Sequence, residues 1–124
     1  GTDQPFQVYG SPSFPNQGLS FTPRADITNP NRVLKDQLCY GFELSHVPEA
    51  APHEGRRVEL KWLIQAYRLY PDKEKFFIPF FSKVAGNSLL QQQIIRGVPE
   101  AEIRQSWEPG LAKFRAIRER YLLY

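Results

Sequence analysis

Residues 38 to 44 read Leu38-Cys39-Tyr40-Gly41-Phe42-Glu43-Leu44. The larger apolar side chains occupy every second position and alternate with a cysteine, a glycine and a glutamate. Neighbouring side chains of a β-strand point to opposite faces of its sheet, so this period of two predicts a half-buried strand. We expect Tyr40 and Phe42 to belong to the core. Residues 6–9 and 19–23 are further candidate strands.

Proline is concentrated in the same half of the chain as these strands. Seven of the 11 prolines lie within residues 1–52. Proline cannot donate a hydrogen bond to a sheet and breaks the interior of a helix. We therefore expect short strands joined by ordered loops in this half, with a turn at Thr28-Asn29-Pro30-Asn31.

After Gly55 the spacing of the apolar residues changes from two to between three and four. Leu60, Leu63, Ile64 and Tyr67 fall at i, i+3, i+4 and i+7. This pattern predicts an amphipathic helix, which we expect to end at the turn sequence of residues 70–72. The polar residues between them, Lys61, Gln65 and Arg68, are predicted to face away from the core.

The segment from residue 73 to residue 97 has a less regular pattern. Residues 73–83 are rich in phenylalanine and interrupted by Pro79, so we expect a short strand followed by one turn of helix. A helix is predicted over residues 88–96, burying Leu90 and Ile94, with Leu89 and Ile95 as further candidates for the core. Gly97 suits the position after this helix, where the backbone is often left-handed.

The last part of the sequence predicts two helices. Pro99 suits the first position of a helix, where its missing N–H costs nothing. Pro109 and Gly110 are expected to interrupt that helix. An apolar stripe then continues in a final helix. The aromatic residues that we expect to pack into the core from these helices are Trp107, Phe114 and Tyr121.

Strands followed by helices predict an α+β fold. We expect a small mixed or antiparallel sheet from the N-terminal half, with the C-terminal helices packed against it. The length of 124 residues suits a single domain. The chain opens at Gly1 and contains no methionine. We therefore expect residues 1–124 to be one domain processed or cut from a larger protein.

The charge is distributed unevenly along the chain. The net charge is +3, and the excess of basic residues lies in residues 54–124. There the basic residues alternate with glutamates and apolar residues, which is typical of solvated helix faces. We therefore expect no nucleic-acid partner. We also expect no membrane span, because no apolar run approaches the roughly 20 residues that one needs.

The sequence contains no self-sufficient catalytic motif. The two histidines, His46 and His53, lack the spacing of a metal site, and Cys39 suits a buried thiol better than a nucleophile. A pair of carboxylates could hydrolyse a glycoside, and the candidates are Glu43, Glu49, Glu54 and Glu59. The sequence does not indicate which of these glutamates converge. We assign no catalytic residue, no metal ligand and no cofactor.

Several motifs along the chain occur in the order of a known bacterial family. They are Gly1-Thr2-x-x-Pro5-Phe6, Gly10-x-Pro12, Phe21-x-Pro23, Cys39-x-Gly41, and the closing series Trp107, Leu111, Phe114, Arg118 and Tyr121-Leu122-Leu123-Tyr124. In this respect the whole chain resembles the C-terminal part of the DUF1343 proteins, the NamZ-type exo-β-N-acetylmuramidases. Each motif is loose alone, and the order and spacing make the resemblance specific.

The resemblance implies a larger two-domain protein. An N-terminal Rossmann-like catalytic domain would precede this smaller domain, with a substrate cleft near their junction. The family removes N-acetylmuramic acid from peptidoglycan fragments, so the implied partners are a peptidoglycan-derived sugar and the catalytic domain of the same polypeptide. The implied location is periplasmic or secreted. The catalytic carboxylate belongs to the absent domain, which predicts that this chain alone is inactive.

The resemblance also provides candidate residues for the substrate cleft. Gly1, Thr2, Pro5 and Phe6 offer an adaptable backbone, a hydroxyl and an aromatic face suited to a sugar. The alternative is that Thr2 and Phe6 simply begin and pack the first strand. At the level of the whole domain, the alternative function is a non-catalytic module that binds a glycan or another polymer.

Overall fold

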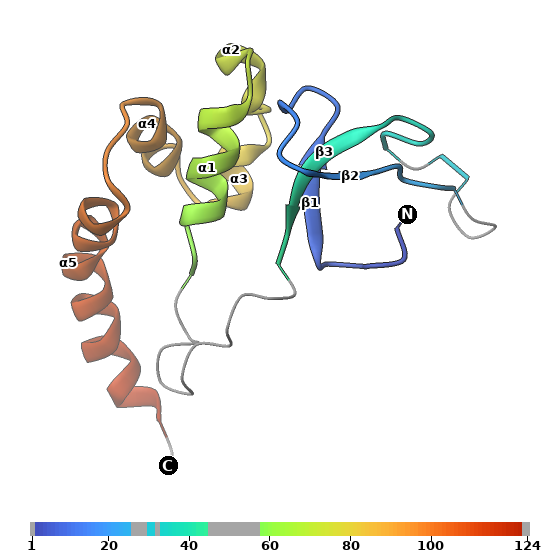
Figure 1. Ribbon diagram of the computed structural model, residues 1–124. Coiled ribbons are helices and arrows are strands. Elements are labelled where there is room, and N and C mark those ends of the chain that lie inside the picture. The colour runs from blue at the N-terminus through green and yellow to red at the C-terminus, as the bar shows by residue number, and fades with distance from the viewer. Residues whose placement is uncertain (1, 26–29, 32, 45–57, 123–124) are drawn as a thin grey trace. The chain divides into compact units, whose positions relative to one another are not determined.

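The computed structural model describes residues 2–25, 30–31, 33–44 and 58–122 (Figure 1). It divides into two compact units, Gly1–Phe76 and Phe77–Tyr124, which are described separately below. The first unit contains β1 (Val8–Ser11), β2 (Leu19–Phe21), β3 (Cys39–Glu43), α1 (Lys61–Leu69) and α2 (Lys73–Phe76). The second unit contains α3 (Phe81–Val84), α4 (Leu89–Ile95), α5 (Glu100–Arg118) and the 3₁₀-helix η1 (Glu119–Tyr121).

The first unit is built on a three-stranded antiparallel sheet with the strand order β1-β3-β2. The strand predicted from the alternating residues 38–44 is therefore the central one (Figure 1). The candidate strands 6–9 and 19–23 also form, as β1 and β2, with their bounds shifted by a few residues. The α+β fold class and the N-terminal position of the sheet are confirmed.

Two glycines face each other where β1 pairs with β3. Gly10 lies opposite Gly41. A Cβ added at Gly41 would collide with the backbone of Tyr9 and would lie 2.7 Å from the Gly10 Cα. A Cβ at Gly10 would lie 3.0 Å from ring carbon Cε1 of Phe21, so this ring from β2 packs against the glycine pair. The two strands approach this closely because neither residue carries a side chain.

Both faces of β3 contribute to packing. Tyr9 and Phe42 stack with their ring centroids 5.4 Å apart, and Tyr9 meets Trp62 of α1 edge-on at 6.2 Å, so helix α1 covers this face. Phe42 is only half-buried, whereas Cys39 is fully buried. Leu38, predicted to share the buried face, is 51% exposed because the strand begins one residue later.

Helix α1 forms where the change of period predicts it. Leu60, just before the helix, is buried, and Tyr70 ends it. The prediction that Gln65 faces away from the core is wrong. Its Oε1 accepts a hydrogen bond of 3.0 Å from the Tyr9 hydroxyl, and burial raises the pKa of Tyr9. The polar residue is thus a partner for a half-buried hydroxyl of the sheet.

Lys73 closes the C-terminal end of α1. Its Nζ donates to the carbonyl oxygens of Tyr67, Arg68 and Tyr70, at 2.6, 2.7 and 2.6 Å. The last carbonyls of a helix have no partner within it, and a cation there also interacts favourably with the helix dipole. One side chain therefore satisfies three carbonyls at this end of the helix.

We expect Lys73→Met to lower the free energy of unfolding of the first unit by about 1 kcal/mol, since the carbonyls lose a charged donor. Urea unfolding followed by Trp62 fluorescence, in a Trp107→Phe background, measures this. Lys75→Met is the matched control. Lys75 is exposed and pairs with the Asp72 carboxylate at 2.7 Å, holding the pKa of Asp72 below its usual value. An equal loss in both variants would contradict the capping role of Lys73.

The prediction of a short strand within residues 73–83 is wrong. The segment forms two four-residue helices, α2 and α3. Phe76 lies in α2 and packs edge-on against Tyr67 and Tyr70, at 5.3 and 5.6 Å. Local packing of aromatic rings thus overrides the β-propensity of phenylalanine.

The second unit confirms α4 and its C-terminal glycine. Gly97 has a φ of 73°, the left-handed conformation expected after a helix. Pro99 is the N-cap residue of α5, one position before the predicted place. Gln93 of α4 donates through Nε2 to Oγ of Ser106 in α5 at 3.1 Å. Ile94 and Ile103 are buried, whereas Leu89 and Ile95, the further core candidates of α4, are exposed.

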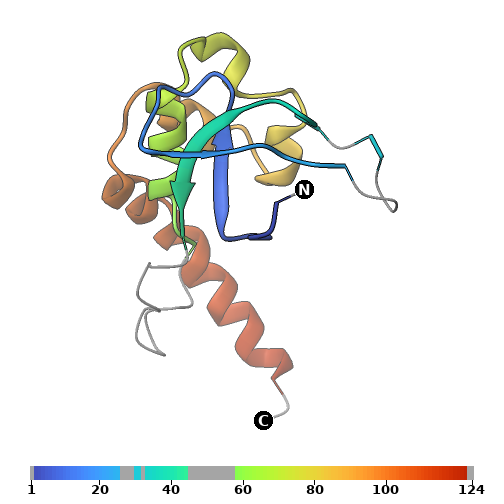
Figure 2. The same ribbon diagram turned by 45° about the vertical axis from the view of Figure 1, so that its right-hand side comes forward.

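Pro109 does not end α5, contrary to the prediction. The helix runs from Glu100 to Arg118 without a break (Figure 2). Proline removes one backbone hydrogen bond and strains the preceding turn, but the helical bonds on either side hold the two halves together. The apolar positions before and after Pro109 therefore belong to one helix.

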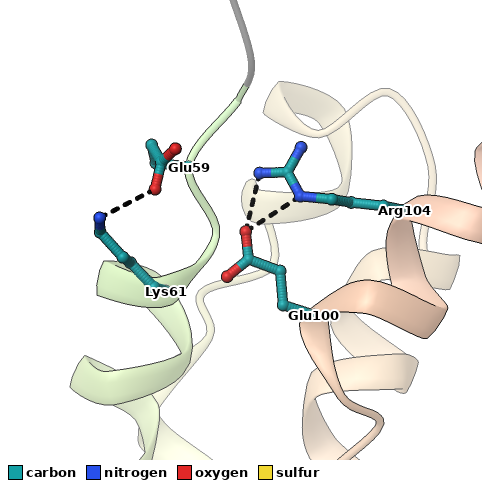
Figure 3. A network of polar contacts seen from close by, with 4 residues as sticks. All are labelled: Glu59, Lys61, Glu100 and Arg104. Carbon is teal, nitrogen blue, oxygen red and sulfur yellow. Dashed lines mark hydrogen bonds and ion pairs between the residues drawn. The ribbon is translucent and has the colours of Figure 1, made fainter. Parts of the chain in front are cut away.

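Ion pairs occur near the starts of the two longest helices (Figure 3). In the first unit, Nζ of Lys61 lies 3.2 Å from Oε2 of Glu59. In the second, Arg104 donates to Oε1 of Glu100 from Nε at 3.1 Å and from Nη2 at 2.7 Å. Glu100 is in the first turn of α5, where a negative charge also favours the helix dipole.

Two aromatic residues predicted for the core are exposed instead. Phe114 and Tyr121 are 60% and 78% exposed, and Trp107 is half-buried. A regular apolar stripe shows which side chains share a helix face, but it does not show that the chain itself covers that face.

Candidate functional site

The site begins at a tight turn before β1. The Gln7 amide donates to the Gln4 carbonyl at 3.2 Å, which places Pro5 second and Phe6 third in a four-residue turn. Proline favours the second position because its ring fixes φ. Two bonds to the end of β3 hold the turn. Nε2 of the Gln4 side chain donates to Oε1 of Glu43 at 3.2 Å, and the backbone N–H of Leu44 donates to the Gln7 carbonyl at 2.7 Å.

Phe6 has two unusual properties. Its φ is 62°, in the left-handed region that a turn of this kind usually fills with glycine or asparagine. Its side chain is fully exposed, at 101% of the reference area. A bulky residue in this conformation costs free energy, and the exposed ring gains none back from packing. Such outliers concentrate at ligand-binding positions.

The turn forms one side of a hollow of about 1010 Å³ in the first unit. The other side is the end of β2 and the segment that follows it. The described residues that line it are Thr2, Asp3, Gln4, Pro5, Phe6, Val8, Phe21, Thr22, Arg24 and Ala25. A volume of this size accommodates a sugar or a small oligosaccharide.

The lining is chemically mixed. Phe6 offers an aromatic ring, Thr2 and Thr22 offer hydroxyls, and Arg24 and Asp3 carry opposite charges. Hydroxyl, amide and charged groups beside an exposed ring suit a polar ligand that also has an apolar face. Asp3 is the one carboxylate among these lining residues. The described residues of the hollow therefore do not provide the pair of carboxylates that glycoside hydrolysis generally uses.

The other candidates for catalysis remain separate from the hollow or outside the described residues. Burial raises the pKa of the Cys39 thiol, which disfavours the nucleophilic thiolate, and its Sγ lies 3.6 Å from the Gln37 carbonyl oxygen. Glu43 and Glu59 take part in the contacts given above, whereas His46, His53, Glu49 and Glu54 lie outside the described residues. No cluster of potential metal ligands occurs within the described part of the chain.

Three of the four cleft residues predicted from the sequence line the hollow together. They are Thr2, Pro5 and Phe6, and Gly1 lies outside the described residues. Thr22 and Arg24 were not predicted. They follow the C-terminal end of β2, and only the pairing of β2 with β3 brings them near the turn. Their sequence signal was weak: they flank Pro23 of the Phe21-x-Pro23 motif.

Comparison with known proteins identifies the family. The family model described as "Exo-beta-N-acetylmuramidase NamZ, C-terminal" matches residues 1–124. The chain belongs to the NamZ C-terminal family. The peptidoglycan β-N-acetylmuramidase NamZ of Bacillus subtilis (strain 168) is 27% identical over 136 residues, which include the whole of this chain.

A solved structure of the family supports the fold. A DUF1343 family protein from Bacteroides fragilis NCTC 9343 matches the whole chain with a TM-score of 0.86 and 33% sequence identity. The chain covers 33% of the Bacillus NamZ and 35% of the Bacteroides protein. It therefore spans about a third of the length of these NamZ-family relatives. Within the described residues, no helix is long and apolar enough to cross a membrane.

Proposed function

We propose that this chain is the auxiliary C-terminal domain of a peptidoglycan-degrading exo-β-N-acetylmuramidase and that its hollow forms part of the substrate cleft. The carboxylates that break the glycosidic bond would then come from the N-terminal domain of the same polypeptide. The proposed substrate is a peptidoglycan fragment ending in N-acetylmuramic acid. The proposed location is the periplasm or the cell exterior, where such fragments occur.

The observation that carries this proposal is Phe6, a lining residue of the hollow whose ring is fully exposed and whose backbone has a positive φ. An aromatic ring can stack on the apolar face of a pyranose, while hydroxyl and charged groups bind its edges. The family supports the choice of ligand, because the Bacillus relative is named for its action on peptidoglycan. The described lining residues include one carboxylate, Asp3, rather than a pair, which supports a division of labour between two domains.

A glycan-binding module that works alone is the second candidate function. The same exposed ring favours it, because stacking on a sugar does not require a second domain. The two functions differ in what the isolated chain does. A cleft wall binds muropeptides weakly or not at all without its catalytic domain, whereas a binding module shows saturable binding. Calorimetric titration of this chain with a muropeptide distinguishes the two functions.

We expect Phe6→Gly to lower kcat/KM of the complete gene product on a chromogenic N-acetylmuramide by about tenfold or more, since about 1.4 kcal/mol of stacking is lost. The substitution should leave the stability of the domain nearly unchanged. Relief of the strained φ offsets the greater freedom of glycine in the unfolded chain, so the free energy of unfolding stays within about 0.5 kcal/mol of the wild type.

Two controls sharpen this test. Phe6→Tyr keeps an aromatic ring and should retain most of the activity. Phe80→Ala removes another exposed ring, 58% exposed and outside the lining of the hollow, and should leave kcat/KM unchanged. Unchanged activity in Phe6→Gly would overturn the role of the hollow. Full turnover by the isolated chain would overturn the proposed division of labour.

A further inference from the structure

One face of α5 is apolar along the whole helix but is covered only near its start. Ile103 and Trp107 are followed at the same face by Leu111, Phe114 and Ile117, since successive helix residues are offset by 100°. Ile103 is buried and Trp107 half-buried, whereas Leu111, Phe114 and Ile117 are 39%, 60% and 45% exposed. The face therefore continues beyond the part that the unit covers.

The uncovered part extends into η1. Tyr121 and Leu122 are 78% and 47% exposed. We call these neighbouring exposed residues the distal stripe: Leu111, Phe114, Ile117, Tyr121 and Leu122. Soluble surfaces usually expose large apolar side chains singly. Five such side chains along one stripe are typical of a protein–protein interface.

The C-terminal half of α5 is a poor helix by itself. It is about ten residues long, and it begins with Pro109 and Gly110, the two residues that least favour a helix interior. Isolated helices of this length are marginal in water, and most helical stability in proteins comes from packing of an apolar face. A partner on the distal stripe would supply that packing.

The charges around the stripe indicate the chemistry of the partner. Residues 109–122 carry four basic side chains and one acidic one, Glu119; the basic ones are Lys113, Arg115, Arg118 and Arg120. Arg118 falls on the same helix face as Phe114 and Ile117. The surface that covers the stripe should therefore be apolar at its centre and carry carboxylates opposite these cations.

We propose that the distal stripe docks onto the N-terminal domain of the same polypeptide. This inference rests on the proposed function. In the two relatives, about two-thirds of the polypeptide lies outside the region matched here, so a larger domain is tethered to each matched domain. A tether keeps such a partner at high effective concentration, which lets a stripe of modest area stay covered.

The test uses hydrogen exchange in the complete gene product. We expect the amides of residues 111–122 to be protected, and the double variant Phe114→Asp/Ile117→Asp to speed their exchange by at least tenfold. Ala112→Asp/Ala116→Asp is the matched control, because it adds the same charges to the same helix on the opposite, exposed face. It should leave the exchange rate within about twofold of the wild type.

Three results would overturn the docking proposal. They are fast exchange of the stripe in the wild type, equal acceleration in both double variants, and protection that rises with protein concentration together with dimers in sedimentation. The last would assign the stripe to a second copy of the chain. The hydrogen-exchange results do not depend on the activity measured for Phe6→Gly. Protection of the stripe with full activity in Phe6→Gly would leave the docking intact and reject only the role of the hollow.

Discussion

Replacement of Gly41 by alanine is expected to lower the free energy of unfolding of the first unit by about 4 kcal/mol or more. The added methyl group would meet backbone atoms of Tyr9 and Gly10, which cannot move aside as a flexible side chain can. β1 would have to separate from β3, which would break one of the two strand pairings of the sheet. A domain of this size has only about 5–15 kcal/mol of stability, so this loss removes roughly a quarter of it or more and should lower the urea midpoint of the first unit markedly.

The two tryptophans allow each unit to be followed separately. Trp62 lies in α1 of the first unit and Trp107 in α5 of the second. Urea unfolding of Gly41→Ala in a Trp107→Phe background therefore reports on the sheet and its helix. Gly110→Ala is the control, and it is followed by Trp107 fluorescence in a Trp62→Phe background because Gly110 belongs to the second unit. Its Cβ meets nothing within 4 Å, so it should raise stability by about 0.5–1 kcal/mol through its better helix propensity. A loss below 1 kcal/mol in Gly41→Ala would contradict the close approach.

The sequence was informative where one local pattern determines the outcome. The alternation over residues 38–44 predicted a strand, which forms as β3 at Cys39–Glu43, and the change of period predicted α1. Gly97 predicted the end of α4 because a left-handed residue there requires little else. In each case the physical cause lies within a few residues of the element, so the sequence alone contains it.

The errors arose where contacts distant in sequence decide the structure. Gln65 looks like a solvent-facing residue until the Tyr9 hydroxyl is placed beside it, 56 positions away. Pro109 looks like a helix end, but hydrogen bonds on both sides of it keep α5 continuous. Phe114 has the spacing of a core residue, and the described residues of the chain leave it exposed.

The candidate site shows the same division. The family motif predicted Gly1, Thr2, Pro5 and Phe6 as cleft residues, and the last three line the hollow, while their role in binding stays a prediction. The positive φ of Phe6 could not be predicted, because a phenylalanine after a proline gives no sign of a left-handed backbone. Arg24 joins the site only through the strand pairing that brings β2 beside β3. Side chains that topology assembles have no local sequence signal.

Ile103→Ala is expected to lower the free energy of unfolding of the second unit by about 2–5 kcal/mol. Ile103 is fully buried on the face of α5 that continues into the distal stripe. Its truncation removes buried apolar area and leaves a cavity. Unfolding followed by Trp107 fluorescence in a Trp62→Phe background measures the effect. In a separate Trp107→Phe background, the transition reported by Trp62 should move less, because Ile103 belongs to the second unit.

Ile103→Val is the matched control for this cavity, and it should cost about 0.5–1.5 kcal/mol because it removes a single methylene. Phe114→Ala provides the contrast along the same face. Its side chain is 60% exposed, so in the isolated chain the loss should stay below about 1 kcal/mol. In the complete gene product the same substitution should cost more, because docking buries the ring there. Equal costs of Phe114→Ala in the two settings would contradict a covered stripe, whereas a cost of Ile103→Ala no larger than that of Ile103→Val would contradict a packed core at the start of α5.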